Sequence, residues 1–133
     1  GARLALADAL ARAGLAASDV DYINLHGTAT PKNDEVEAAL VADGFRAATR
    51  ASSTKGWTGH ALGAAGILEA VLTLLAIRDG LVPGTLNTTT PDARCGPQLA
   101  LDNESRTIRV ALSNSFGFGG NNCTLAFGAA RTH

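Results

Sequence analysis

Two histidines in glycine- and threonine-rich surroundings are the side chains best suited to do chemistry in this sequence. His26 lies in the run NLHGTATP (24–31), and His60 lies in the run STKGWTGHALGAAG (53–66). Two neutral imidazoles that each donate a ring N–H can hold one carbonyl oxygen as it becomes an enolate oxyanion. Either histidine alone would be read more readily as a hydrogen-bonded structural residue, so only the pair predicts an oxyanion site.

A lysine and a glutamate accompany His60. Lys55 precedes it, and Glu69 lies in the otherwise apolar stretch that follows. Because a buried charge without a partner is costly, we expect a Lys55–Glu69 ion pair whose field helps to fix the tautomer and orientation of His60. The alternative is that both side chains reach solvent.

A third glycine-rich run, NSFGFGGNN (114–122), joins two predicted strands. Glycines on both sides of Phe118 give the backbone freedom to move a bulky side chain. Core packing of Phe116 and Phe118 is an equally compatible interpretation. Phosphate binding is not indicated, because neither a G-x-x-x-x-G-K-[ST] run nor a strand-anchored G-x-G-x-x-G run is present.

The cysteines do not suggest a nucleophile, a metal site or a disulfide framework. Cys95 and Cys123 adjoin no base in the sequence, so packing is the favoured interpretation. Together with the three histidines, His133 included, they form no zinc pattern, and we predict neither metal nor cofactor. With no signal peptide visible, a reducing, cytoplasmic setting is expected.

Size and composition favour one compact domain. The chain has 133 residues, 46% of them hydrophobic, with 11 basic and 12 acidic side chains and a net charge of -1. This balance leaves no electrostatic footprint for nucleic acid or for an acidic membrane surface. The apolar stretch 61–77 is shorter than the roughly 20 residues of a membrane-spanning helix. Because the sequence has no Met and opens on helical residues, we expect Gly1 to mark a truncation or processing boundary.

The pattern of apolar and turn residues predicts alternating helices and strands. Helices are expected over 2–13 with Gly14 as the stop, from an Asn33 N-cap to Gly44, and from a Thr58 N-cap to 78 with Gly80 beyond. Strands are expected over 20–25, 47–53, 98–101, 108–113 and 123–128, with a long ordered loop over 82–97. In a parallel α/β layer both histidines would reach one crevice at the carboxyl edge of the strands. The long helix is apolar almost all round and must be covered on several sides.

Taken together, the three runs resemble the C-terminal half of an elongating β-ketoacyl-acyl carrier protein synthase. The resemblance implies a thiolase-like α/β fold of two similar halves, with residues 1–133 forming the second half, a mixed and mainly parallel sheet and helices on both faces. It implies decarboxylative Claisen condensation of an acyl-enzyme with malonyl-acyl carrier protein, in fatty acid or in polyketide and polyene biosynthesis.

The resemblance also assigns roles to residues. His26, His60 and Lys55 correspond to catalytic residues, with the two histidines on the malonyl thioester carbonyl. Supporting residues are Glu69, Thr28 and Thr30, and the acyl gate and oxyanion loop comprises Phe116, Phe118, Gly119 and Gly120. Implied partners are acyl carrier protein, the N-terminal half, and a second subunit in a homodimer or a ketosynthase heterodimer.

The family's nucleophilic cysteine belongs to the other half and is absent from this sequence. Neither Cys95 nor Cys123 matches it, so the chain alone is predicted to be inactive and to expose a large apolar face. Ala29, Trp57 and Asn121 depart from the usual family residues and leave the subfamily open. A non-catalytic partner subunit of the chain-length-factor kind is the alternative; the retained histidines and Lys55 argue against it.

Overall fold

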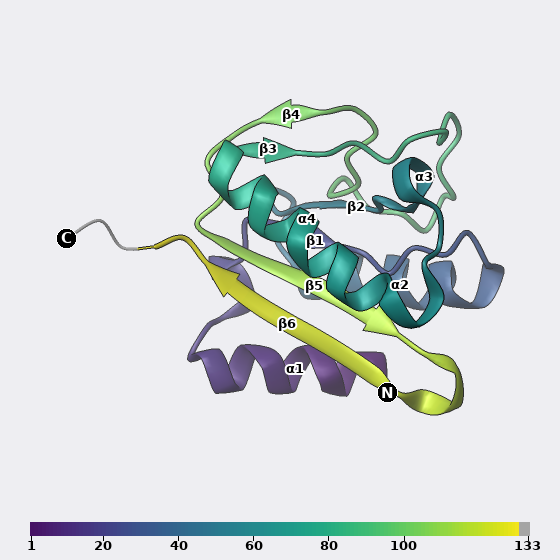
Figure 1. The fold of residues 1–133 in the computed structure, drawn as a ribbon, viewed down its shortest axis with the longest axis horizontal. Helices are drawn as coiled ribbons and strands as arrows, with labels where there is room; N and C mark the ends of the chain where they lie inside the picture. Colours follow the sequence, from purple (N-terminus) through teal and green to yellow (C-terminus); the bar gives the residue numbers. More distant parts are fainter. Residues whose placement is uncertain (131–133) are drawn as a thin grey trace.

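The computed structural model describes residues 1–130, which form a mixed α/β fold around a four-stranded sheet (Figure 1). The strand order is β2-β1-β5-β6, with β1 at Tyr22–Asn24, β2 at Arg50–Ser52, β5 at Val110–Phe116 and β6 at Asn122–Gly128. Strand β1 pairs in parallel with β2 and β5, whereas β6 is antiparallel to β5. The predicted mixed and mainly parallel sheet is therefore confirmed.

Helices cover both faces of this sheet. Helices α1 (Ala2–Ala13) and α2 (Pro31–Gly44) lie on one face, and α4 (Ala65–Asp79) crosses the other (Figure 1). Because successive side chains of a strand point to opposite faces, Ile23 packs with the α1 and α2 side chains and Tyr22 with the α4 side. The predicted helix-on-both-faces arrangement is also confirmed.

Two helices end where glycine permits a left-handed residue. Gly14 follows α1 with φ 65°, and its N–H is donated to the Ala11 carbonyl at 3.1 Å. Gly80 follows α4 with φ 61°. Both stops are as the sequence predicts.

The start of α2 differs from the prediction. The helix begins at Pro31 with Thr30 as N-cap residue, and Asn33 is already inside its first turn. Proline presets the φ of a first helical residue, so the helix can start earlier. The Asn33 side chain turns inward and donates to Glu37 Oε2 at 2.8 Å, so it does not cap the helix.

The long helix predicted from Thr58 onward is interrupted. Thr58 ends the one-turn helix α3 (Lys55–Thr58), and a 3-10 turn, Leu62–Ala64, precedes α4. Gly59 has φ 74° and Leu62 has φ 50°, both outside the helical range. His60 therefore lies in an irregular connection and not at a helix start.

The strand predicted over residues 98–101 also needs correction. Residues 98–101 form no regular strand; only Leu99 makes an isolated parallel bridge to Ala51. In their place, β3 (Leu81–Val82) and β4 (Glu104–Ser105) pair as a short antiparallel sheet. The isolated bridge has a local cause, because Arg50 reaches the Pro97 and Leu99 carbonyls with its side chain and holds this segment by hydrogen bonds.

Helix α4 is covered on one side only within residues 1–130. Glu69, Ala70, Thr73 and Ala76 are buried, but Ile67 remains 69% exposed. Val71 and Leu74 extend the same exposed apolar surface. The predicted exposed apolar face is therefore present, and the cover expected around α4 is not supplied by these residues. None of the helices in residues 1–130 has the length and hydropathy needed to cross a membrane.

Candidate active site

Three parallel strands bring the predicted site residues to one edge of the sheet. Strand β1 leads into His26, β2 leads into Lys55, and the end of β5 carries Phe116. The ring centroids of His26 and His60 are 5.4 Å apart, and those of His26 and Phe116 are 6.1 Å apart. The predicted meeting of the two histidines at the carboxyl edge is confirmed.

A buried glutamate that the sequence interpretation missed fixes the backbone at His26. The Glu37 carboxylate accepts the His26 N–H at 2.9 Å and the Gly27 N–H at 2.6 Å. The Asn33 and Asn114 side-chain amides donate to it as well. Burial raises the pKa of Glu37, and these four hydrogen bonds oppose that rise. From the sequence alone Glu37 is only an acidic residue near a helix start, because its partners come from other segments.

The predicted Lys55–Glu69 ion pair is present, with side chains only 8% and 3% exposed. The Lys55 ammonium also donates to the His26 carbonyl oxygen at 2.5 Å and lies 3.2 Å from His26 Nδ1. The lysine thus contacts His26, whereas the sequence led us to expect an effect on His60. The physical reason is register: β1 and β2 are parallel neighbours, so the segments following them lie side by side.

Hydrogen bonding assigns the His26 tautomer. An ammonium group can only donate, so Nδ1 accepts from Lys55 and the ring proton resides on Nε2. Burial, then the Lys55 charge, then His60 lower the pKa of His26 from 6.5 to about 4. His26 is consequently a neutral imidazole near pH 7, with Nε2–H free to donate.

The Nδ1 atom of His60 is engaged by a different contact. His60 is exposed, and its Nδ1 accepts the Leu62 backbone N–H at 3.1 Å. In the neutral ring the proton then resides on Nε2. Two neighbouring rings, inclined at 87°, can therefore each offer an Nε2–H to one oxygen.

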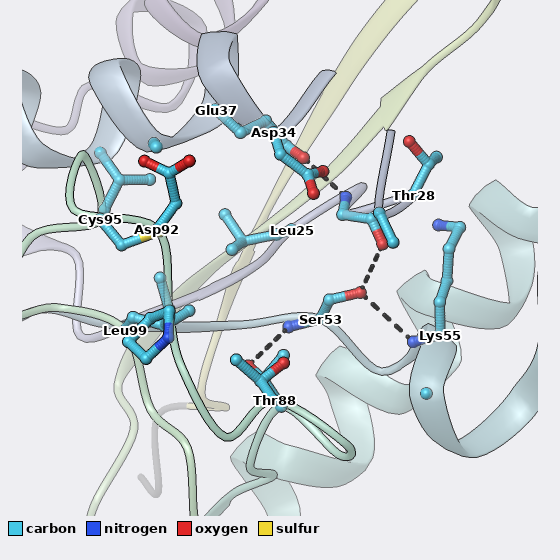
Figure 2. Close-up of a pocket in the computed structure, with 18 of the residues that line it drawn as sticks. Leu25, Thr28, Asp34, Glu37, Ser53, Lys55, Thr88, Asp92, Cys95 and Leu99 are labelled. Carbon is cyan, nitrogen blue, oxygen red and sulfur yellow. Dashed lines mark hydrogen bonds between the residues drawn. The ribbon is translucent and has the colours of Figure 1, made fainter. Parts of the chain in front are cut away.

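A cavity of about 540 Å³ adjoins these residues, between α2, the ends of β1 and β2, and the loop that precedes Leu99. Figure 2 shows Asp34 and Glu37 on its α2 side, Asp92 and Cys95 at the left of the view, and Thr88 opposite the α2 residues. Thr28, Lys55 and His60 line it as well. Burial raises the pKa of the Cys95 thiol, in keeping with a packing role. The second supporting threonine, Thr30, shares a hydrogen bond of 2.8 Å with the Thr28 hydroxyl.

The predicted gate residues are placed differently from one another. Phe116 contacts the His26 side of the site, whereas the Phe118 side chain is 100% exposed. Gly119 and Gly120 follow it with φ 76° and 83°. The turn is closed by the Gly117 N–H, which donates to the Asn121 carbonyl at 2.8 Å. Only these glycines allow so tight a left-handed turn, so the position of Phe118 depends on them.

Known proteins share both the sequence and the fold. The family described as β-ketoacyl synthase, C-terminal domain, matches residues 1–89, and the chain therefore belongs to that family. Its fold is that of the ketosynthases, and the predicted thiolase-like class is confirmed.

Individual relatives agree with this assignment. The chain is 49% identical to 3-oxoacyl-[acyl-carrier-protein] synthase 2 of Synechocystis, over 96% of this chain and 32% of that protein. It is 45% identical to the mitochondrial 3-oxoacyl-[acyl-carrier-protein] synthase of Arabidopsis thaliana, over 96% of this chain and 29% of the relative. The structure of the ishigamide ketosynthase/chain length factor superposes with a TM-score of 0.93 at 33% identity, covering 98% of this chain and 33% of that one. The chain spans about a third of the length of the relatives it matches.

Proposed function

We propose that residues 1–133 are the C-terminal domain of a 3-oxoacyl-[acyl-carrier-protein] synthase, an acyltransferase that performs decarboxylative Claisen condensation. The observation that carries the proposal is the pair of facing imidazoles whose Nδ1 atoms are both occupied, by Lys55 and by the Leu62 N–H. Each ring then keeps its Nε2–H for a substrate oxygen, and the ring centroids are 5.4 Å apart. Such a preorganised pair of donors stabilises developing negative charge on oxygen.

The reaction uses this pair of donors as an oxyanion site. The thioester carbonyl of malonyl-acyl carrier protein accepts both Nε2–H groups. The bond between the carboxylate and the α-carbon breaks, and carbon dioxide leaves. The electron pair of that bond stays on the α-carbon and forms the enolate, whose oxygen His26 and His60 hold. The enolate carbon then attacks the carbonyl of an acyl-cysteine thioester, forming the new carbon–carbon bond and releasing the cysteine thiolate.

Lys55 and Glu69 support this reaction without touching the substrate. Lys55 holds His26 Nδ1 and, after burial, is the second cause that lowers the pKa of His26 and keeps the ring neutral. Glu69 compensates the buried ammonium. Lys55 is on this view a positioning residue for His26. Phe116 lies beside His26, with ring centroids 6.1 Å apart, in keeping with its proposed place in the acyl gate and oxyanion loop.

The nucleophilic cysteine and much of the acyl site are assigned to an N-terminal half. Cys123 is exposed on β6, and Cys95 sits in a loop with a raised pKa, so neither suits that role. This chain by itself is therefore expected to be inactive. The exposed face of α4, with Ile67 at 69%, fits a surface that such a half would cover.

The proposed partners follow from the same reaction. Acyl carrier protein is the proposed carrier of both substrates, and it is part of the name 3-oxoacyl-[acyl-carrier-protein] synthase that the relatives bear. A second subunit completes a homodimer or a ketosynthase heterodimer. The chain-length-factor alternative is supported by similar structures that pair a ketosynthase with a chain length factor. The intact His26–Lys55–Glu69 contacts argue for the catalytic role. A cytoplasmic location stays a prediction for cell fractionation to test.

A His60→Ala substitution in the complete synthase tests the function. The upstream cysteine should still be acylated, but release of carbon dioxide from malonyl-acyl carrier protein should fall at least 100-fold, on the order of the loss seen when one oxyanion donor is removed. Arg12→Ala, an exposed change on α1, serves as the control. Undiminished decarboxylation in His60→Ala would refute the assignment. If the upstream segment has no reactive cysteine and is not acylated, the result would instead support the partner-subunit role.

A further inference from the structure

Trp57 is the single tryptophan of the chain and lies on α3, between Lys55 and His60. Its side chain is 54% exposed, yet its indole is anchored: Nε1–H donates to the Gly84 carbonyl at 3.0 Å. The mechanism proposed above gives this residue no role.

Gly84 belongs to a segment, residues 83–88, that we call the strap. The strap runs past α3 after β3 (Figure 1). The Thr85 hydroxyl accepts the Ser53 N–H at 3.4 Å, and the Leu86 carbonyl approaches Gly56 so closely that a Cβ there would lie 2.7 Å from it. The strap is therefore contacted by three residues: Ser53, Gly56 and Trp57.

The strap is itself fixed on its other side. The Gly84 N–H donates to Asn103 Oδ1 at 2.9 Å, and both the backbone N–H and the hydroxyl of Thr85 donate to the Ala100 carbonyl at 2.9 Å. Ala100 is completely buried. An anchor on the strap is thus an anchor to the body of the domain.

Helix α3 needs such an anchor. It has four residues, and one helical turn is not stable by itself. Its first residue is Lys55, and Gly59, with φ 74°, joins it to His60. A small rotation of α3 would move the Lys55 ammonium away from His26 Nδ1 and swing His60 in the same motion.

We propose that Trp57 is a positioning residue for the decarboxylation, because its indole N–H clamps α3 to the strap and thereby sets both Lys55 against His26 and the direction of His60. This inference rests on the proposed function. It assigns a role to a residue at which this sequence departs from the aliphatic or Met residue usual in the family it resembles.

The test uses Trp57→Phe in the complete synthase, because phenylalanine keeps an aromatic ring and removes the N–H. Expected is a fall on the order of tenfold in kcat for malonyl decarboxylation, as small misplacements of positioned groups produce. The KM and acylation of the upstream cysteine should stay near wild type. Leu81→Ala, which trims the apolar groove beside Trp57 without touching the strap hydrogen bond, is the matched control and should leave kcat unchanged.

A second readout is independent of activity. The ring of His26 is faced by Lys55, His60 and Phe116, its backbone by Glu37, and Glu69 acts on it through Lys55. If Lys55 drifts from Nδ1 in Trp57→Phe, the NMR titration of a labelled His26 ring moves to higher pH. An unchanged titration and an unchanged kcat, in a wild type that decarboxylates, would overturn the role of Trp57.

Two further outcomes are separable. A wild type that does not decarboxylate refutes the proposed function, and the His26 titration still decides whether Trp57 positions Lys55. Should Trp57→Phe fail to fold, Gly56→Ala pushes the Leu86 carbonyl away from α3 and should shift the same titration. A folded Gly56→Ala protein with a wild-type titration would equally count against the clamp.

Discussion

The two histidines of the site are held by very different means. His26 is 6% exposed, its backbone N–H is bound by Glu37, and its ring is held by Lys55. His60 is exposed and has one hydrogen bond, from Leu62. The chain therefore preorganises His26 completely, whereas the surroundings of His60 are open.

The same contrast runs through the two faces of the sheet. On the α1 and α2 face, Leu6, Leu10 and Phe45 close a continuous core. On the α4 face, Ile67 and Leu74 remain exposed. The exposed His60 lies a few residues before α4, with only the 3-10 turn Leu62–Ala64 between them. The exposed part of the site is therefore next to the exposed face of the fold.

Loss of Lys55 should have the largest effect on this contrast. In Lys55→Ala, Glu69 is left as an uncompensated buried carboxylate, which costs about 3 kcal/mol of unfolding free energy. His26 also loses the donor on Nδ1, so decarboxylation should fall more than 100-fold in the complete synthase. Urea unfolding and carbon dioxide release measure the two effects.

Lys32→Ala, an exposed lysine on α2, is the matched control for that change. The hydrogen bond from Leu62 to His60 should survive in Lys55→Ala, so the His60 ring resonances should stay in place. Movement of the His60 signals as large as that of His26 would show that the two histidines are not held independently.

Removal of Glu37 should cause the second-largest loss of unfolding free energy. Glu37→Ala leaves the buried His26 N–H and the adjacent Gly27 N–H without their acceptor, at a cost of about 2 kcal/mol. Thermal melting should show the loss, and Glu35→Ala, an exposed glutamate of the same helix, should not. Equal melting temperatures for the two variants would mean that Glu37 does not hold the His26 loop.

The pH dependence of His26 provides a third comparison. Its pKa is 6.5 in the unfolded chain and about 4 in the fold, so the unfolded state binds the extra proton between these values. The stability that neutral His26 contributes is complete above pH 6.5 and is lost as the pH falls toward 4. Histidine NMR should show the His26 ring as a neutral imidazole at pH 5.5. A ring already protonated there would contradict the tight Lys55 contact.

The smallest expected effect concerns Ala29, which follows His26 in the left-handed region at φ 59°. A left-handed conformation costs an alanine about 1 to 2 kcal/mol. Glycine removes this cost, but it loses more backbone entropy on folding, which offsets part of the gain. Ala29→Gly should therefore raise the unfolding free energy by about 0.5 kcal/mol. Ala93→Gly, at a residue without positive φ, should not stabilise the protein, and a destabilised Ala29→Gly would show that the loop relies on the alanine methyl group.

The sequence by itself determined the features that depend on neighbouring residues. Glycine at 14 and at 80 marks helix ends because a left-handed residue is needed there. The runs around His26 and His60 indicate the family and the edge of the sheet, and the cost of an unpaired buried charge predicts the Lys55–Glu69 pair.

Only the tertiary structure decided what those residues touch. Strand register places Lys55 against His26 and not His60, and it brings Asn114 and the His26 loop onto Glu37. Left-handed backbone at Gly59 and Leu62 interrupts an apolar run that locally favours one continuous helix. Periodicity and turn chemistry act over a few residues, whereas these contacts join segments far apart in the chain, so the sequence pattern specifies the participants and the packing of the sheet specifies the partners.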